Sequence, residues 1–252
     1  MNILIPMAGA GARFQDAGYT VPKPYIPIEG VPMIQWVVEN LLEKEIHGKY
    51  IFLIQEEHLA YGAEKIILNM FKNTESSCYI ITVPGLTAGQ LCTTLYAREM
   101  INTDEELFIV NSDNYFIWND EHSNISLEED VTGAILTFND PHKSTHWSFA
   151  QVKENNVVTR IEEKNPISDN ALAGGFMWRR GSEFIKNADN IMARQEKVNG
   201  EYYIAPVMNE AILNGSKIIN WTLDDMVSMG TPEELTAFKD WAINKRKSHN
   251  DN

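Results

Sequence analysis

The sequence predicts an α/β fold in which helices cover both faces of a mainly parallel central sheet, a three-layer α/β/α arrangement. Three observations support this prediction. Apolar runs alternate with helical patterns between residues 1 and 115, which is typical of βαβ units. The apolar runs are continuous, as expected for strands that are buried on both faces. With 252 residues, of which 44% are hydrophobic, the chain can bury one sizeable core.

In the first half, strands are expected over residues 2–8, 50–54, 78–83 and 107–110. Helical spacing of apolar residues begins at Pro32, which suits a first helical turn, and two further helical stretches are expected over residues 57–71 and 87–100. Parallel sheets bind ligands at the carboxyl ends of their strands. Both Asp113 and the small-residue segment 9–14, here named the glycine loop, follow such strands. We therefore expect them at the same edge of the sheet.

Beyond residue 130 the expected elements are shorter. Strands are predicted over residues 131–138, 148–152, 157–161 and 176–178, and helices over residues 182–192, 200–213 and 231–247. No Ser-, Gly- or Pro-rich linker separates the two halves. The prediction is therefore a single domain over residues 1–252, with one half at residues 1–130 and a second at residues 131–240.

The chain carries 35 acidic residues against 21 Lys and Arg, a formal net charge of −14. Such a surface repels a nucleic-acid backbone, so no nucleic-acid partner is expected, and an anionic substrate would need a few local cations. Cys78 and Cys92 are too few for a disulfide framework. The first eight residues lack Lys and Arg and contain Pro6, unlike a signal peptide, and no apolar run reaches the roughly 20 residues of a membrane span. We therefore expect a soluble, cytoplasmic protein without a membrane partner.

The glycine loop and a nearby lysine carry the first chemical signal. Small residues such as Gly9 and Gly11 let backbone N–H groups approach phosphate oxygens, and Arg13 adds a fork of donors. Phe14 stands where the dinucleotide fingerprint has its third glycine, and no Walker-type phosphate loop occurs in the chain. Lys23 follows, stiffened by the prolines on either side. Taken singly, these pieces could equally be a structural turn and a surface lysine.

Together, Gly9-x-Gly11-x-Arg13-Phe14, Lys23-Pro24 and Pro32-Met33-Ile34 resemble the signature of the sugar-nucleotidylyltransferase (NTP-transferase) family. Later segments are similar to further landmarks of that family, in the same order and over nearly the whole chain: residues 85–90, Ser112-Asp113-Asn114, Glu163-Lys164, residues 173–176, 200–203 and 229–233. Each motif is short, and it is their ordered set that carries the resemblance. One departure is Asn165, which stands between Lys164 and Pro166.

The resemblance implies a Rossmann-like fold of GT-A type and a Mg²⁺-dependent transfer. In that reaction a phosphorylated small molecule attacks the α-phosphorus of an NTP and releases pyrophosphate. Implied catalytic residues are Arg13, Lys23 and Asp113, with Asp113 also holding the metal. The implied nucleotide-binding residues, in the half at 1–130, are Ala8, Gly9, Ala10, Gly11, Ala12, Thr87, Ala88, Gly89 and Ser112. The implied acceptor-binding residues, in the half at 131–240, are Glu163, Lys164, Gly174 and Gly175.

Several alternatives stay open. The family often has a second metal carboxylate where this chain has Ser228, so Asp224 or Asp225 could substitute, or both could be surface acids. A glycosyltransferase of related fold would want Asp-x-Asp in place of Ser112-Asp113-Asn114, and a non-catalytic nucleotide sensor would have no use for Lys164. The donor base is unresolved, with CTP slightly favoured. The acceptor is expected to be a sugar 1-phosphate or, as in the capsule branch that includes CTP:phosphoglutamine cytidylyltransferase, a non-sugar phosphate. No residue pattern supports a particular oligomeric state.

Overall fold

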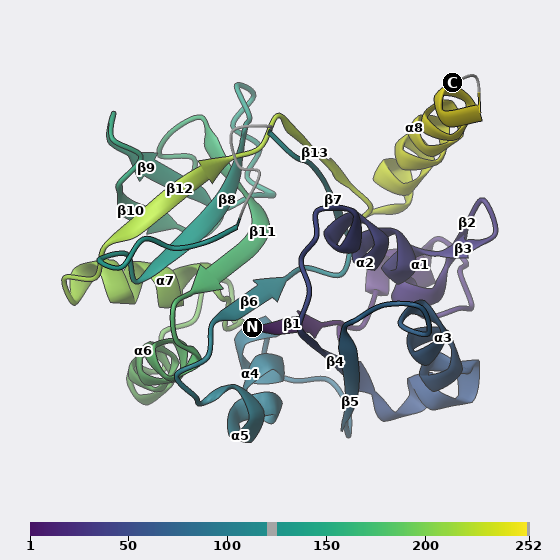
Figure 1. Ribbon diagram of the computed structural model, residues 1–252, viewed down its shortest axis with the longest axis horizontal. Coiled ribbons are helices and arrows are strands. Elements are labelled where there is room, and N and C mark those ends of the chain that lie inside the picture. Colours follow the sequence, from purple (N-terminus) through teal and green to yellow (C-terminus); the bar gives the residue numbers. More distant parts are fainter. Residues whose placement is uncertain (120–124, 251–252) are drawn as a thin grey trace.

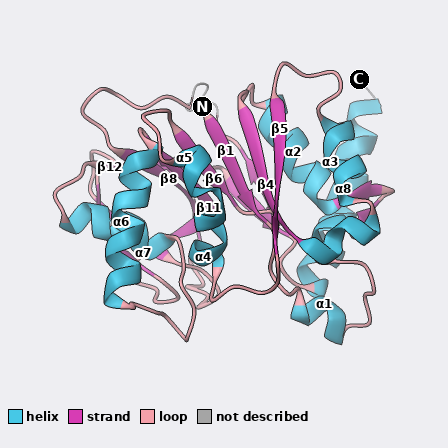
Figure 2. Ribbon diagram, turned by 90° about the horizontal axis from the view of Figure 1, so that it is seen from below, coloured by secondary structure: helices cyan, strands magenta, loops and turns pink. Residues whose placement is uncertain are grey.

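A nine-stranded sheet runs through the molecule, with helices packed on both of its faces (Figure 1, Figure 2). The computed structural model describes residues 1–119 and 125–250. Four parallel strands form one side of the sheet in the order β5-β4-β1-β6, with β5 at the edge. Their bounds are Asn2–Pro6 for β1, Lys49–Gln55 for β4, Ser77–Val83 for β5 and Leu107–Val110 for β6. The mainly parallel central sheet predicted from the continuous apolar runs is confirmed.

The remaining strands of this sheet come from the second half of the chain. They are β8 (Gly133–Asn139), β9 (Phe149–Val152), β10 (Val158–Glu162), β11 (Asn170–Trp178) and β12 (Ile218–Thr222). The long strand β11 pairs antiparallel with β8 along one side and with β9 and then β6 along the other. The second half therefore extends the sheet of the first half without interrupting it.

The two faces of the sheet are covered by different helices (Figure 2). The first face packs against α1 (Ala12–Asp16), α2 (Met33–Glu43), α3 (Ala63–Met70) and α8 (Pro232–Asn250). The opposite face packs against α4 (Gln90–Thr94), α5 (Arg98–Ile101), α6 (Gly181–Arg194) and α7 (Ala205–Leu213). Along β1, Ile3 and Ile5 join the first core cluster and Leu4 the second, because successive side chains of a strand point to opposite faces. This is the predicted three-layer arrangement.

Several short elements lie around the sheet. They are η1 (Lys23–Tyr25), β2 (Pro27–Ile28), β3 (Val31–Pro32), η2 (Glu56–Tyr61), η3 (Leu95–Ala97), β7 (Asn114–Ile117) and β13 (Asp225–Ser228). The antiparallel ribbon of β7 and β13 brings the end of the chain back beside the segment that follows β6. None of the described helices is long and apolar enough to cross a membrane.

Several expected elements differ in extent. The stretch expected to be helical over residues 57–71 is divided by Gly62, whose left-handed φ of 75° ends η2 before α3 begins. The stretch at 87–100 is split into α4, η3 and α5. The helix expected from Pro32 begins at Met33, because Pro32 is extended and pairs with Pro27. Only residues 205–213 of the expected helix 200–213 are helical, since residues 198–201 form a tight bridged turn around Gly200.

Candidate active site

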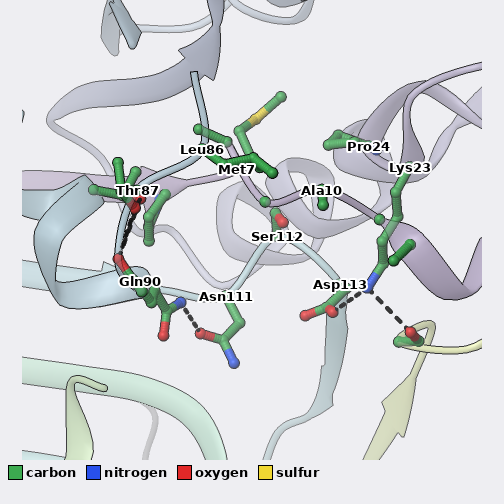
Figure 3. A pocket seen from close by; sticks show the side chains of 18 of the residues that line it. Met7, Ala10, Lys23, Pro24, Leu86, Thr87, Gln90, Asn111, Ser112 and Asp113 are labelled. Atoms are coloured by element: carbon green, nitrogen blue, oxygen red, sulfur yellow. Dashed lines mark hydrogen bonds and ion pairs between the residues drawn. The ribbon is translucent and has the colours of Figure 1, made fainter. Parts of the chain in front are cut away.

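A cleft of about 470 Å³ opens at the carboxyl edge of the sheet, next to the ends of β1 and β6. Its walls come from the glycine loop, from η1, from the loop before α4 and from the residues after β6 (Figure 3). The sequence-predicted residues that line it are Ala8, Gly9, Ala10, Gly11, Ala12, Arg13, Lys23, Thr87, Gly89, Ser112 and Asp113. The structure thus places both implied donor-side cations and the implied metal ligand in one cleft.

The glycine loop is held from behind by a residue that sequence reasoning missed. Gln55, the last residue of β4, donates from its side-chain amide to the carbonyl oxygens of Ala8 and Gly9, at 3.0 and 3.2 Å. Gly11 has a left-handed φ of 61°, and a Cβ there would lie 3.2 Å from the Cβ of Lys23. Glycine takes this backbone conformation without strain and leaves Lys23 in place. The position of Gln55 at the end of a buried strand was the available signal.

The two donor-side cations present their charges differently. Nζ of Lys23 lies 2.5 Å from Oδ2 of Asp113, 3.3 Å from the carbonyl oxygen of Gly230 and 5.4 Å from the ring centroid of Phe14. Figure 3 shows the lysine reaching across the cleft to this carboxylate. Arg13 is exposed at the rim of the cleft and makes no ion pair with any residue that the structure describes. Lys23 is therefore a fixed ammonium, and the guanidinium of Arg13 is free to bind an incoming anion.

A second carboxylate lies beside Asp113, and it belongs to Glu234 in the first turn of α8. Oε2 of Glu234 accepts a hydrogen bond from the hydroxyl of Ser228 at 2.9 Å. A Cβ built on Gly230 would lie 3.0 Å from this Oε2 and 3.6 Å from Oδ2 of Asp113, so one oxygen of each carboxylate lies close to Gly230. Thr231 accepts a bond from the backbone N–H of Glu234 at 3.2 Å, as in a capping box. The Thr-x-x-Glu spacing was readable from the sequence, but the proximity of Glu234 to Asp113 was not.

Asp224 and Asp225, considered from the sequence as second metal ligands, are not brought to Asp113. Ser228 pairs with Asn114 at the cleft end of the β7–β13 ribbon, and Asp225 pairs with Ile117 three positions further along. At about 3.4 Å per residue, that separation is roughly 10 Å. Oδ1 of Asp224 accepts a hydrogen bond from Asn119 at 2.9 Å. Both acids therefore lie at the far end of the ribbon.

The loop before α4 is tied to the segment that precedes α7. The backbone N–H of Tyr202 donates to the carbonyl of Ala88 at 2.9 Å, and the N–H of Leu91 donates to the carbonyl of Tyr202 at 3.0 Å. A Cβ on Gly89, whose φ is 130°, would lie only 2.4 Å from the Tyr202 carbonyl oxygen. The hydroxyl of Thr87 donates to the carbonyl of Gly89 at 2.9 Å, which closes the loop. Ala88 therefore supports the loop and does not line the cleft.

The implied acceptor residues lie on the second half of the chain. Gly175 pairs with Val110 of β6. A Cβ on Gly174 would meet the side chain of Asn111 at 2.3 Å, so this turn packs directly against the end of β6. Gly174 has a left-handed φ of 83°, which glycine adopts without strain. The two glycines thus bring the acceptor-side half against the segment that carries Asp113.

Glu163 and Lys164 form the turn after β10. The carboxylate of Glu163 accepts a hydrogen bond from Ser148 at 2.5 Å, and burial raises the pKa of this carboxyl above its ordinary value, with Ser148 and Lys164 opposing the shift. Nζ of Lys164 donates to the phenol oxygen of Tyr203 at 2.5 Å. Within the described residues Lys164 does not line the cleft, but Glu201, two residues before Tyr203, does.

A glycine loop, two cations and two carboxylates at one edge of a parallel sheet make the kind of site in which α/β proteins bind nucleotide phosphates. The chain belongs to the nucleotidyl transferase family, whose sequence profile matches residues 3–237. The family resemblance and the α/β fold class expected from the sequence are thereby confirmed.

Two curated relatives illustrate the range of this similarity. The bifunctional protein GlmU of Methanococcus aeolicus is 27% identical over 214 residues, which are 84% of this chain and 47% of that protein. The UTP–glucose-1-phosphate uridylyltransferase of Pseudomonas aeruginosa is 30% identical over 105 residues, 38% of this chain and 35% of that enzyme. The chain spans about half the length, or less, of these curated relatives.

Solved structures cover the whole fold. A nucleoside-diphosphate-sugar pyrophosphorylase from Vibrio cholerae RC9 superposes with a TM-score of 0.79 at 26% identity, covering 94% of this chain and 99% of that one. The inositol-1-phosphate CTP transferase from T. maritima has a TM-score of 0.73 at 13% identity, with 92% and 90% covered. The second similarity is one of fold alone.

Proposed function

We propose that this chain catalyses Mg²⁺-dependent nucleotidyl transfer from an NTP to a phosphorylated small molecule, with release of pyrophosphate. The observation that carries the proposal is the convergence of the glycine loop, Arg13, Lys23 and Asp113 on one cleft at the carboxyl edge of the sheet. The chain has a net charge of −14, so these local cations are what would make the cleft attractive to a polyanion.

In this reaction an oxygen of the acceptor phosphate forms a bond to the α-phosphorus of the NTP while the bond to the pyrophosphate oxygen breaks. The protein has to position the two anions and neutralise charge, and it supplies no covalent intermediate. Arg13 and the N–H groups of the glycine loop would bind the triphosphate, and Lys23 would stabilise charge at the α-phosphate. The loop at Thr87–Gly89 and Ser112 would hold the nucleoside.

The residues at Asp113 fit a magnesium ion. Mg²⁺ prefers oxygen ligands and in nucleotide sites uses one or two protein carboxylates, with waters and phosphate oxygens completing its shell. Asp113 and Glu234 supply two carboxylates close to Gly230, and no group of three or more metal-binding side chains occurs among the residues described. Bound there, the ion would neutralise phosphate charge. Ser228 would hold Glu234 in this orientation through the hydrogen bond between them.

In this proposal Lys164 would bind the acceptor phosphate, and Glu163, Gly174 and Gly175 would form the adjacent wall. An ammonium on the second half of the chain can serve the acceptor without contacting the NTP. The names of the relatives support a sugar 1-phosphate: they include an enzyme for glucose 1-phosphate and a nucleoside-diphosphate-sugar pyrophosphorylase. We favour CTP as donor, a role in bacterial capsule or surface-polysaccharide synthesis, and a cytoplasmic location, where NTPs are available. A non-sugar phosphate such as phosphoglutamine is the alternative acceptor.

Pyrophosphate release tests the proposal directly. CTP, UTP, GTP, ATP and dTTP would each be incubated with Mg²⁺ and with glucose 1-phosphate, N-acetylglucosamine 1-phosphate, inositol 1-phosphate or phosphoglutamine. We expect one NTP and acceptor pair to release pyrophosphate in a metal-dependent way and to yield the nucleoside-diphosphate conjugate. Hydrolysis or glycosyl transfer from a nucleotide sugar without pyrophosphate release would contradict the proposal and favour a glycosyltransferase. Tight NTP binding without turnover of any pair would favour a nucleotide sensor.

A further inference from the structure

Lys164 is held by an aromatic side chain from a distant segment. Its ammonium donates to the phenol oxygen of Tyr203 at 2.5 Å and lies 4.5 Å from the centroid of the same ring. The contact joins the turn after β10 to the segment just before α7. Lys164 has a left-handed φ of 55°, an uncommon conformation for a side-chain-bearing residue, so the backbone turn and the tyrosine together determine where the ammonium lies.

Tyr203 also connects Lys164 to the wall of the cleft. Burial raises the pKa of the Tyr203 phenol, while Lys164 lowers it and the charge of Glu201 raises it further. The phenol is therefore protonated at neutral pH, and its oxygen accepts the bond from Lys164. Glu201 lines the same cleft as Arg13 and Lys23. The phenol that holds the ammonium therefore lies two residues along the chain from a residue of the cleft wall.

The backbone of the same segment is fixed by the donor-side loop. Tyr202 exchanges hydrogen bonds with Ala88 and Leu91, and the tight approach of Gly89 leaves no room for movement of this segment towards the loop. The position of Tyr203 is therefore set by the loop assigned to the nucleoside and not by the acceptor-side turn that it contacts.

We propose that Tyr203 is the positioning residue for Lys164: through its hydroxyl, on a segment anchored by the backbone bonds of Tyr202, it holds the acceptor-side ammonium at a fixed distance from the donor-side loop. The inference rests on the proposed function, in which Lys164 binds the acceptor phosphate. Tyr203 itself makes no contact with the reacting atoms. Its removal should therefore affect the acceptor and leave the nucleotide bound as before.

The test is Tyr203→Phe, which keeps the ring beside the ammonium and removes only the hydroxyl. With the NTP and acceptor pair identified by pyrophosphate release, starting from CTP and glucose 1-phosphate, the acceptor KM should rise at least fivefold. The Kd for Mg²⁺–NTP, measured by calorimetry without acceptor, should stay within twofold. Tyr96→Phe is the matched control, because Tyr96 is a half-exposed tyrosine on η3 and should leave both constants unchanged. Circular dichroism and thermal unfolding check that the variants fold.

A double-mutant cycle distinguishes positioning from a general structural effect. If Tyr203 acts through Lys164, adding Tyr203→Phe to Lys164→Ala should change the acceptor KM less than twofold further. An unchanged KM in Tyr203→Phe, an equal effect in both backgrounds, or a fivefold loss of NTP affinity without acceptor would each overturn the proposal. If the acceptor KM rises in Lys164→Ala but not in Tyr203→Phe, the proposed role of Tyr203 is wrong, while the proposed function is still supported. If Lys164→Ala has a normal acceptor KM, or if no NTP and acceptor pair is turned over, both the role of Tyr203 and the proposed function are contradicted.

Discussion

The ammonium of Lys23 lies 2.5 Å from a carboxylate oxygen of Asp113, although the two residues are 90 positions apart in the chain. Their side chains are only 16% and 25% exposed, so the pair is partly shielded from solvent. Each group therefore neutralises the other in the free protein. In the proposed function, the phosphates of a bound nucleotide would give Lys23 a second anion, and a divalent cation would give Asp113 a second positive charge. The pair thus keeps both groups aligned at the point where donor and metal are expected to meet.

Arg13→Ala should lower turnover by on the order of 10²–10³ while leaving the fold unchanged. The reason is the loss of a charge-assisted contact to the triphosphate that strengthens in the transition state. Steady-state pyrophosphate release measures the effect, and Arg180→Ala, an exposed arginine whose only described ion pair is a long one to Asp104, is the control. Unaltered kinetics in Arg13→Ala would contradict the assignment of the glycine loop as the triphosphate-binding site.

Asp113→Asn should abolish most metal-dependent turnover, and Glu234→Gln should weaken metal binding about tenfold. Both changes keep side-chain shape and remove a negative charge that faces the expected ion. Mn²⁺ binding in the presence of NTP, followed by electron paramagnetic resonance, provides a readout that is separate from activity. Asp224→Asn is the control, since this acid lies at the far end of the β7–β13 ribbon. Equal losses of Mn²⁺ affinity in Asp224→Asn and Glu234→Gln would rule out Glu234 as the second carboxylate.

Lys164→Ala should raise the acceptor KM and lower kcat, while the NTP affinity measured without acceptor stays within about threefold. A point charge that faces one anion stabilises only the states in which that anion is present. Calorimetry with Mg²⁺–NTP and kinetics against the acceptor separate the two effects, with exposed Lys65→Ala as control. Loss of NTP binding in Lys164→Ala would move this lysine to the donor side.

Gly89→Ala should destabilise the protein by about 1–3 kcal/mol, the usual cost of overpacking. The new methyl group would meet the backbone of Tyr202 at 2.4 and 2.5 Å, and the residue would sit at a φ of 130°. Gly85→Ala in the same loop is the control, because a Cβ there has no atom within 4 Å and its stability should change by less than about 0.5 kcal/mol. Urea unfolding of the two variants gives the comparison, and equal stabilities would show that the loop can move away from Tyr202.

Glu163→Gln should become progressively more stable than the wild type as the pH rises from 4 to 8. Burial raises the pKa of the folded Glu163 carboxyl above its value of 4.5 in the unfolded chain. The folded state then binds more protons than the unfolded state between these two pKa values, so the wild type loses stability as the pH rises through that interval. The glutamine keeps an acceptor for Ser148 and carries no charge. Urea unfolding across the pH range measures the difference.

The exposed Glu75→Gln serves as the reference for that experiment, since it lies in a surface turn and should show no such pH-dependent gain. A pH-independent stability difference in Glu163→Gln would mean that Glu163 titrates alike in the folded and unfolded states.

The parallel core was predictable because its signal is local. Each of β1, β4 and β6 contains a continuous apolar run. Such a run is by itself the sequence pattern of a strand that is buried on both faces. The strands β7 and β13 were not predicted, because they are short, partly polar and stabilised by each other across more than a hundred residues. Pairing of this kind depends on the completed sheet, which no local window of sequence contains.

The parts of the site that follow a predicted strand were predictable from the sequence, as the parallel strands were. The glycine loop and Asp113 follow apolar strands, so the meeting of both at one edge followed from sheet geometry. Glu234 was missed, and Tyr203 was noted only as part of the landmark at residues 200–203, with no role. Their neighbours Asp113 and Lys164 lie far away in the sequence and become neighbours only when the β7–β13 ribbon and the turn after β10 form. The capping-box pattern that ends at Glu234 predicts the start of a helix, but it does not predict that the Glu234 carboxylate lies near Asp113.

The pairing of β11 with β6 has a consequence for substrate size. Gly175 is hydrogen-bonded in register with Val110, three residues before Asp113, and the ladder continues to Trp178 opposite Leu107. A hinge that opened one half of the chain against the other would have to break this ladder. The span from Gly174 and Gly175 to the carboxylate of Asp113 is therefore a fixed length. If these residues hold the acceptor and the metal as proposed, a longer acceptor would have to be accommodated by the loops, and the length of the acceptor would be one basis of selection.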